Sequence, residues 1–303
     1  MNLYLKHRPD KLRRIIGNEK MIKSLSTELE KEDPAHVYLL HGQTGCGKTT
    51  IARIIGTTLG CIGSDFKEIN TADFRGIDSA RDIIKACQFK AMEGPCRVYL
   101  IDECHKLTKD AQNALLKVFE DTPSHVYFVL CTTDPQDLIS TLKGRCLIFQ
   151  VNPLTDEEME RLLRRTTKLE EAELDDKVYT QIINSSNGLP RNALQLLQQV
   201  LSVPEEMRLE TAKRIENATT LAVDLCKALI RGATWKEIAA ILTELKEEEP
   251  ETVRRIVLGY CGAILLKGTD KPVCGLIMEF FINPFYDTPK AQLLHACYSI
   301  VKN

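Results

Sequence analysis

A glycine-rich segment of this chain has the residue types and spacing of a phosphate-binding loop. It reads Gly42-Gln43-Thr44-Gly45-Cys46-Gly47-Lys48-Thr49, directly follows an apolar run, and precedes a helical pattern at residues 50–58. The glycines would let backbone N–H groups wrap around phosphates, and the helix N-terminus would add partial positive charge. Lys48 would reach the β and γ oxygens, and Thr49 would ligate Mg²⁺. We therefore expect this loop and Thr50 to bind a nucleotide; the alternative is a chance glycine-rich turn.

Two adjacent acids, Asp102 and Glu103, end an apolar run that begins at Val98. In a nucleotide-hydrolysing site the first acid would hold the Mg²⁺ shell, and the second would orient and deprotonate the attacking water. The alternative is a surface acidic pair at the end of a strand. Because hydrolysis needs both a phosphate loop and an acid pair, the combination indicates a nucleotide hydrolase.

Three further residues give weaker signals. Thr133 closes the next apolar run, where its hydroxyl would either position a water or cap the strand. Arg191 begins a helical stretch after Gly-Leu-Pro and would either reach the γ-phosphate or face solvent. Arg145, in Lys-Gly-Arg-Cys, has the same two interpretations. The residue pattern alone leaves all three open.

The elements that must position these residues alternate along the first 150 residues. Short β-branched apolar runs, typical of strands covered on both faces, alternate with helical stretches. The expected strands are His36–Leu40, Phe66–Asn70, Val98–Ile101, Val126–Cys131 and Leu147–Val151. The pattern predicts an α/β nucleotide-binding domain with a mainly parallel sheet at residues 1–152, and a helix-like stretch at Gln136–Leu142.

From Pro153 onward the pattern is helical. Thr155 and Glu158 form a predicted capping box, while Gly188 is expected to end one helix and Pro190 to begin the next. We predict a small helical lid domain at residues 153–203 and an all-helical domain at residues 204–303. In the last domain, apolar periodicity covers Leu221–Ile230, Trp235–Leu245, Thr252–Leu266 and Leu276–Ile282.

Composition excludes several functional classes. No apolar run approaches the roughly 20 residues that span a bilayer, so we expect a cytoplasmic protein without a membrane partner. The eleven cysteines are scattered with no CxxC pair, which indicates reduced, mostly buried thiols and disfavours a metal site. The net charge is only −2, so any nucleic-acid contact must come from a few placed groups or from several subunits together.

Taken together, these motifs resemble those of the clamp-loader branch of the AAA+ ATPases. The stretch from Val98 to Phe149 is similar to the gamma/tau subunit of bacterial DNA polymerase III. Residues 69–83, which read INTADFRGIDSARDI, resemble instead the small subunits of replication factor C. The resemblance covers about residues 3–200 and implies a AAA+ fold with a lid and a helical collar.

The resemblance also implies roles for individual residues. Thr133 matches the sensor 1 position, and Arg191 matches the sensor 2 arginine that couples the lid to nucleotide. Arg145 matches an arginine that acts on ATP held by the neighbouring subunit, although Gly144 replaces the usual serine before it. The residues that match the family's adenine pocket are Tyr4, Arg8, Pro9 and Ile16.

DNA contacts are expected at two residues. Arg75 matches the family, and Lys109 lies beside Thr108, the predicted cap of a helix whose N-terminus would suit a phosphate. The alternative for both is ordinary surface charge. The implied cofactors are ATP and Mg²⁺. No zinc is expected, because only Cys61 occupies the connection that carries a four-cysteine module in the bacterial subunits.

These features predict the ATP-hydrolysing subunit of a DNA sliding-clamp loader. ATP binding would open the clamp and load it onto primer–template DNA, and hydrolysis would release it. The implied partners are other loader subunits in a pentamer, the clamp and DNA. One alternative is another AAA+ DNA motor such as a branch-migration helicase, which residues 73–78 and 144–146 disfavour. The other is a structural subunit of the same assembly, which the intact phosphate loop and acid pair disfavour.

Overall fold

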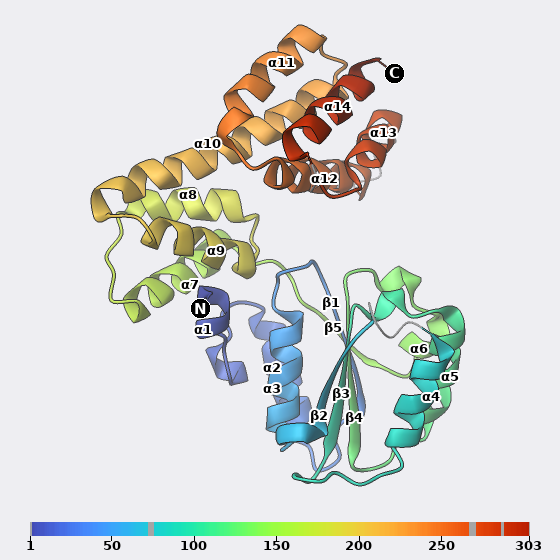
Figure 1. The fold of residues 1–303 in the computed structure, drawn as a ribbon. Helices are drawn as coiled ribbons and strands as arrows, with labels where there is room; N and C mark the ends of the chain where they lie inside the picture. The colour runs from blue at the N-terminus through green and yellow to red at the C-terminus, as the bar shows by residue number, and fades with distance from the viewer. Residues whose placement is uncertain (1, 72–75, 267–270, 286–287, 303) are drawn as a thin grey trace. The chain divides into compact units, whose positions relative to one another are not determined.

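The computed structural model describes residues 2–71, 76–266, 271–285 and 288–302 of the chain (Figure 1). Contacts divide it into two compact units. The nucleotide unit comprises Met1–Leu174 and Ser186–Leu201, and the helical unit comprises Asp175–Ser185 and Ser202–Asn303. Arg75, one of the two expected DNA contacts, lies outside the described residues.

The nucleotide unit is built on a five-stranded parallel sheet with strand order β2-β3-β4-β1-β5. Its strands are β1 Val37–His41, β2 Phe66–Asn70, β3 Arg97–Asp102, β4 Val126–Thr132 and β5 Leu147–Gln150. These bounds confirm the five predicted strands to within one residue at each end. Because all strands run in the same direction, their carboxyl ends share one edge, where His41 is in register with Thr132. The phosphate loop, the acid pair and Thr133 therefore follow their strands at the same edge.

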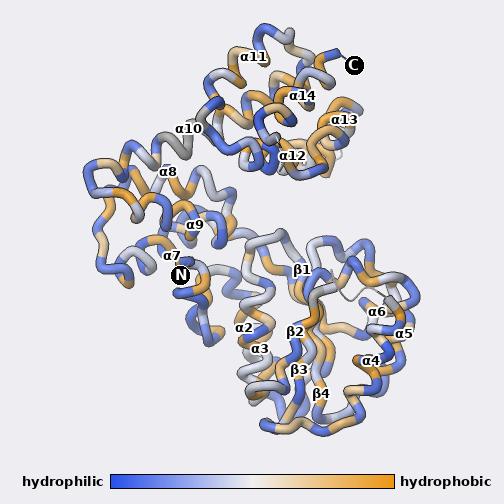
Figure 2. The backbone as a smooth tube through the Cα atoms, viewed as in Figure 1, coloured by the Kyte–Doolittle hydropathy of each residue, from blue (hydrophilic) through white to orange (hydrophobic). Residues whose placement is uncertain are grey.

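Helices cover both faces of this sheet. One apolar core packs α2 Glu19–Leu29 and α3 Lys48–Thr58 against the sheet, and the other packs α4 Ile77–Ala86 and α5 Lys109–Glu120 against the opposite face (Figure 1). In Figure 2 hydrophobic residues are concentrated along the strands and the helix sides that face them. The predicted α/β fold with a parallel sheet is confirmed.

Shorter elements complete the nucleotide unit. They are α1 Leu3–Lys6, η1 Leu12–Arg14, η2 Gly63–Asp65, η3 Cys104–Lys106, η4 Pro135–Asp137 and α6 Ser140–Lys143. The last two replace the single helix-like stretch predicted at Gln136–Leu142. The side chain of Gln112 explains the break, because it donates to Asp137 O (3.4 Å) and accepts from Ile139 N (2.9 Å), which an uninterrupted helix would use internally.

Helices α7 Asp156–Leu169 and α9 Pro190–Leu201 also belong to the nucleotide unit, whereas α8 Asp176–Ser186 is assigned to the helical unit through Ser185. The capping box of Thr155 and Glu158 is present as predicted. Gly188 has φ +71°, and a Cβ there would lie 2.8 Å from the carbonyl oxygen of Leu154, so only glycine fits this turn. The division between the units runs through residues 153–203, and the three-domain boundaries remain a prediction.

The helical unit is all-helical, as expected. Its elements are α10 Glu205–Ile230, α11 Trp235–Glu244, η5 Leu245–Glu247, α12 Pro250–Leu266, α13 Pro272–Phe281 and α14 Pro289–Lys302, in addition to most of α8. Three of these helices begin at a proline, whose missing N–H costs nothing at the first helical position. The four predicted periodic stretches lie within α10 to α13, apart from single residues at two ends. The core is a continuous apolar cluster that includes Cys226, Cys261, Cys274 and Cys297.

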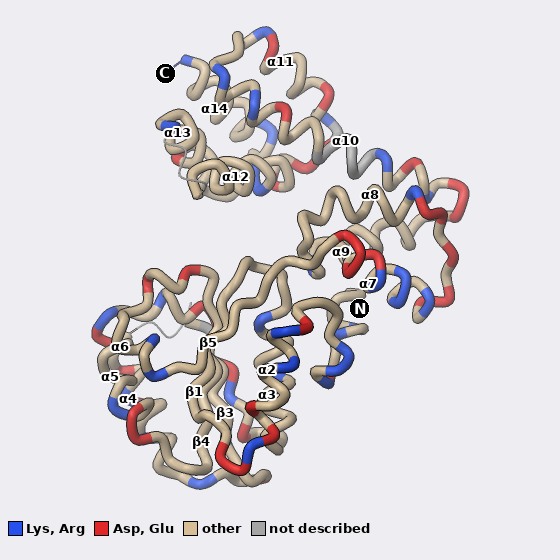
Figure 3. Tube along the Cα trace, turned by 180° about the vertical axis from the view of Figure 1, so that it is seen from behind, with Lys and Arg blue, Asp and Glu red and all other residues tan. Residues whose placement is uncertain are grey.

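All eleven cysteines carry free thiols, and ten of them are buried, which confirms their interpretation as buried apolar side chains. No helix among the described residues is long and apolar enough to cross a membrane. In the same residues no three His, Cys, Asp or Glu side chains group around a possible metal ion, and the absence of zinc stays a prediction. Basic and acidic residues alternate along the chain trace in both units (Figure 3).

Candidate nucleotide-binding site

The phosphate loop connects β1 to α3 through backbone conformations that need glycine. Gly45 and Gly47 have φ values of +89° and +104°, in the left-handed region. Gly42 has φ +151°, and a Cβ there would lie 2.1 Å from the carbonyl oxygen of Val151. The N-terminus of α3 has no side-chain cap, so its backbone N–H groups are the donors available to an anion. The loop therefore has the shape and polarity of a phosphate cradle.

Lys48 lies inside this loop with its side chain buried. Its ammonium donates to Gly42 O at 2.7 Å and to Gln43 O at 3.0 Å. Gly42 and Gln43, which the sequence predicts at the site, therefore contact Lys48, although neither residue lines the cavity. Burial, together with the charge of Lys48, lowers the pKa of His41 at the end of β1. The loop thus holds one full positive charge where phosphates would lie.

Thr49 and Asp102 meet between α3 and β3. The Thr49 hydroxyl donates to Asp102 Oδ2 at 2.9 Å, while Asp102 Oδ1 accepts from the backbone N–H of Glu103 at 2.9 Å. Hard oxygen donors of this kind are the ligands that Mg²⁺ prefers, usually alongside waters and phosphate oxygens. The two residues that the sequence assigned to Mg²⁺ are therefore adjacent and fit that ion.

Glu103 follows β3 in an unusual backbone conformation. Its φ is +54°, in the left-handed region that non-glycine residues occupy at a cost. The Thr71 hydroxyl fixes this turn by donating to the carbonyl oxygens of Asp102 (3.0 Å) and Glu103 (2.8 Å). The Glu103 side chain lines the cavity, and its carboxylate lies 3.3 Å from the Lys106 ammonium. Strained residues of this kind concentrate at functional sites.

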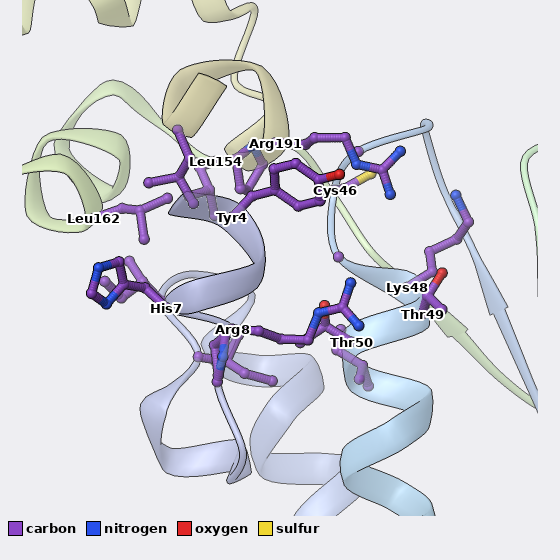
Figure 4. A pocket seen from close by; sticks show the side chains of 18 of the residues that line it. Tyr4, His7, Arg8, Cys46, Lys48, Thr49, Thr50, Leu154, Leu162 and Arg191 are labelled. Atoms are coloured by element: carbon purple, nitrogen blue, oxygen red, sulfur yellow. The ribbon is translucent and has the colours of Figure 1, made fainter. Parts of the chain in front are cut away.

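A cavity of about 360 Å³ adjoins the phosphate loop (Figure 4). This volume falls in the ordinary range of small-molecule sites. All four residues expected at the adenine pocket line it, namely Tyr4, Arg8, Pro9 and Ile16. The sequence did not predict the remaining wall, which includes His7, Leu154, Leu162, Arg165, Thr166 and Leu169. The apolar spacing along α7 is the signal that could have identified Leu162 and Leu169 as one helix face.

Polar contacts hold the N-terminal segment against this wall. The backbone N–H of Leu3 donates to Gln198 Oε1 at 2.9 Å, and both Lys6 and His7 contact the Glu170 carboxylate. Hydrogen bonds from Lys6 and His7 lower the pKa of Glu170. Residues near the start of the chain are therefore attached to the ends of α7 and α9.

Two arginines, Arg8 and Arg191, line the cavity beside the phosphate loop. Figure 4 shows the guanidinium groups of Arg8 and Arg191 directed toward the phosphate loop and the start of α3. Arg191 lies over the Tyr4 ring, 5.8 Å from its centroid, and its backbone N–H donates to Gly45 O at 3.4 Å. Burial, with the nearby charge of Arg53, lowers the pKa of Arg8. Among the described residues, the buried Nε of Arg8 has no hydrogen-bond partner, which suits an incoming anion.

The other predicted residues lie outside the cavity. The Thr133 hydroxyl donates to Asp134 Oδ2 at 2.5 Å. Arg145 donates to Thr141 O at 3.0 Å and forms an ion pair with Glu120 at 3.1 Å. Lys109 is exposed at the start of α5, where the Thr108 hydroxyl caps the helix by accepting from Ala111 N at 3.2 Å. The structure therefore brings together the phosphate, magnesium and adenine residues but not these three.

The strand order, the loop after β1 and the acid pair after β3 define a P-loop nucleotide-binding protein of the AAA+ class. Comparisons with known proteins narrow this class. A family profile described as "DNA polymerase III, delta subunit" matches residues 61–155. The DNA polymerase III subunit gamma/tau of Mycobacterium tuberculosis is 32% identical over 67% of this chain and 39% of its own length.

Further relatives agree. The DNA polymerase III subunit tau of Bacillus subtilis is 30% identical over 99% of this chain and 58% of its own length, and subunit gamma of Buchnera aphidicola (subsp. Schizaphis graminum) is 33% identical over 65% and 60%. The chain thus spans 39% to 60% of these relatives. The solved structure of the Thermotoga maritima RuvB Holliday junction branch migration motor superposes with a TM-score of 0.61 and 25% identity, covering 78% of this chain and 85% of its own. The chain is thus an AAA+ protein whose sequence is similar to the gamma and tau subunits of DNA polymerase III.

Proposed function

We propose that this chain hydrolyses ATP as a subunit of a DNA sliding-clamp loader. The observation that supports hydrolysis is the convergence of Lys48, Thr49, Asp102 and Glu103 beside a cavity of mononucleotide size. The observation that supports clamp loading is the likeness to the gamma/tau subunits. A non-hydrolysing subunit would have no use for the intact acid pair of this chain. Cytoplasmic residence is part of the same proposal.

Each residue then has a separate task in phosphoanhydride hydrolysis. Lys48 leaves its carbonyl partners to neutralise the β and γ oxygens, and the α3 N-terminus binds the same phosphates through backbone N–H groups. Thr49 and Asp102 would hold Mg²⁺, which supplies further charge neutralisation when bound. Glu103 orients the attacking water and takes its proton. Arg191, on the lid helix α9, would contact the γ-phosphate and so couple the lid to the nucleotide. Thr133 would position the same water.

The proposed assembly has three domains in each subunit, with residues 204–303 as a collar in a pentamer. Arg145 would act on ATP bound by a neighbouring subunit. Its position supports this role, because it does not line its own chain's cavity and is paired instead with Glu120 on the surface. ATP binding would open the clamp and load it onto primer–template DNA, and hydrolysis would release the complex.

DNA contact is proposed at Lys109 and at Arg75. Lys109 is exposed at a helix N-terminus. The cation and the helix N-terminus together would bind a DNA phosphate without reading the base sequence. Replacing both cations with alanine should reduce DNA-stimulated ATPase and leave basal ATPase alone. Equal loss of both activities would point to a folding or nucleotide-site defect instead.

The likeness to a branch migration motor supports a second candidate function, that of a branch-migration helicase. A helicase of that kind would share the phosphate loop and the acid pair, and its fold matches over most of this chain. Stimulation distinguishes the two, because a loader's ATPase needs clamp and primed DNA together. We therefore propose to measure steady-state ATPase with clamp, with primed DNA and with both. Synergy between the two ligands supports a loader, whereas stimulation by branched DNA without clamp contradicts it.

The shared active site has its own test. Arg145→Ala should leave ATP binding by the isolated chain intact and remove the extra hydrolysis gained on assembly, since such arginines contribute on the order of 10³ to 10⁵ in rate where measured in GTPases. Mixing Arg145→Ala with Lys48→Ala subunits creates interfaces that pair an intact Lys48 with an intact Arg145. We expect partial recovery of activity. Mixtures that co-assemble and stay inactive would rule the shared site out.

A further inference from the structure

His105 lies between the acid pair and the end of β4. It belongs to η3, two residues after Glu103, and its side chain is largely buried. Its Nδ1 atom lies 3.0 Å from the hydroxyl of Thr132, and its Nε2 atom lies 3.6 Å from Glu103 Oε2. The Asp134 carboxylate is 4.0 Å from the same Nε2 atom. One imidazole ring thus spans from the β4 end to the proposed catalytic base.

Hydrogen-bond directions assign the tautomer of this ring. Thr132 is fully buried at the last position of β4, and its oxygen already accepts from the backbone N–H of Asp134 at 3.0 Å. In the described part of the chain, the other contact of the Thr132 hydroxyl is with His105 Nδ1, so the hydroxyl proton has an acceptor there only when Nδ1 carries no proton. A neutral ring that accepts at Nδ1 carries its own proton on Nε2. That proton faces the Glu103 carboxylate.

We propose that His105 is a positioning residue for Glu103, held in its tautomer by Thr132; this inference rests on the proposed ATP hydrolysis. The closest approaches of His105 and Lys106 are both to Oε2 of Glu103, which leaves Oε1 for the attacking water. At 3.6 Å the His105 contact is longer than a hydrogen bond, and catalytic hydrogen bonds are often this long before substrate binds. Outer-shell partners that orient metal ligands are worth about 10- to 100-fold in affinity or activity, and for His105 we expect an effect at the lower end of this range.

The contacts that link His105 to Thr132 extend to Thr133, the residue expected at the sensor 1 position. Asp134 is bonded to Thr132 through its backbone and to the Thr133 hydroxyl through its side chain. A shift of the Thr132–Asp134 turn would therefore move His105, and with it the Glu103 carboxylate. The β4 end and the catalytic base would respond together to the γ-phosphate, without a direct contact between Thr133 and Glu103.

Two conservative replacements separate positioning from simple packing. Glutamine places an amide near the Nε2 position, and asparagine places one near Nδ1. If His105 acts on Glu103, His105→Gln should retain most of kcat, whereas His105→Asn and His105→Ala should lose about 10-fold, with KM changed by less than about twofold. An asparagine variant that matches the parent would overturn the proposal, because the Thr132 contact would then suffice. His125→Asn is the matched control, since the half-buried His125 makes an exposed hydrogen bond with Phe89 O elsewhere in the unit.

A second measurement does not depend on activity. The chain has six histidines, so ¹⁵N labelling of histidine and replacement of His105 identify its ring signals. In the nucleotide-free protein, at a pH where the ring is neutral, we expect protonated Nε2 and unprotonated Nδ1. Thr132→Val should change the Nδ1 signal and lower kcat, while Thr132→Ser should preserve both. An Nδ1–H tautomer in the parent would contradict the assignment. A parent chain without ATPase activity would defeat the proposed function, but the tautomer would still test the contact.

Discussion

The nucleotide unit and the helical unit both bury apolar cores, yet they differ in the surroundings of their buried charged groups. In the nucleotide unit Lys48, Thr71 and Thr132 are buried near the carboxyl edge of the sheet, and the buried Arg8 Nε has no partner among the described residues. In the described part of the helical unit the buried charged residues are Glu251 and Arg254, which bind each other. A charged group that lines a cavity without a partner suits an incoming ligand, whereas a buried pair of opposite charges that bind each other stabilises the fold.

Each unit also contains one buried ion pair that stabilises a turn. Asp65 accepts from the backbone N–H groups of Met92, Glu93 and Gly94 and pairs with Arg97. In the helical unit, Glu251 binds Arg254 through two hydrogen bonds of 2.7 Å, and Arg254 donates to Phe281 O and Ile282 O at the end of α13. Neither pair lines the nucleotide cavity. The comparison predicts that substitutions that impair ATP binding and hydrolysis differ from those that lower the free energy of unfolding.

The largest expected effect is on turnover. Glu103→Gln keeps the size of the side chain and removes the base, so kcat should fall by about 10² to 10⁴ while ATP affinity stays close to that of the parent. Single-turnover hydrolysis and equilibrium nucleotide binding measure the two quantities. Glu30→Gln is the control, because Glu30 is exposed at the end of α2 and outside the cavity. Normal turnover in Glu103→Gln would mean that another residue activates the water.

The next effect is on stability and should be confined to the helical unit. Glu251→Gln leaves Arg254 buried without its counter-charge, which costs roughly 3 kcal/mol. The protein's one tryptophan, Trp235, packs edge-to-face on Tyr298 in this unit, so its fluorescence during urea unfolding reports the loss. The exposed neighbour Glu249→Gln should change stability by less than about 0.5 kcal/mol. Weakened ATP binding by folded Glu251→Gln would contradict the separation of roles.

A smaller effect is expected on nucleotide affinity. Lys48→Ala removes the charge held between Gly42 O and Gln43 O, and the Kd for ATP should rise about 10- to 100-fold, as for loss of a charge-assisted hydrogen bond. Titration with a fluorescent ATP analogue measures it. The exposed Lys117→Ala on α5 should bind like the parent. If Lys48→Ala also bound ATP normally, the phosphate-loop assignment would fail.

The smallest effect is a change in pH dependence. Hydrogen bonds from the backbone N–H groups of Glu93, Met92 and Gly94, together with one from the Arg97 guanidinium, bring the pKa of Asp65 down to about 2, from an ordinary 3.8. Because the folded pKa lies below the unfolded one, this carboxylate contributes stability above about pH 4 and loses it as the pH falls toward about 2.

Thermal midpoints of the parent and Asp65→Asn, measured by circular dichroism from near-neutral to acidic pH, test this window. The difference between them should be constant above about pH 5 and shrink toward about pH 3. Asp78→Asn removes an exposed carboxylate and should follow the parent at every pH. A difference that stays constant into acid would show that Asp65 does not stabilise the fold through its charge.

Much of the nucleotide site could be predicted from the sequence because its elements are local. The loop after β1 depends on the closely spaced glycines Gly42, Gly45 and Gly47, while Asp102 ends β3 and Glu103 directly follows it. Parallel strands bring their carboxyl ends to one edge, which places Thr49 beside Asp102 although 53 residues separate them. The adenine-pocket residues needed the family resemblance as well, since no spacing relates Tyr4 to the phosphate loop.

Other features were decided only by the tertiary structure. Glu170 binds Lys6 and His7 from 164 and 163 residues away, and Gln112 breaks the stretch after β4 from 25 and 27 residues away. The orientation of His105 toward both Thr132 and Glu103 likewise depends on how η3 packs against β4. The sequence by itself determined the strands, the phosphate loop and the acid pair, because backbone preference and apolar periodicity act over a few neighbouring residues. The cavity's second wall, the ion pairs and the histidine contact arise from packing angles between distant elements, which no local pattern encodes.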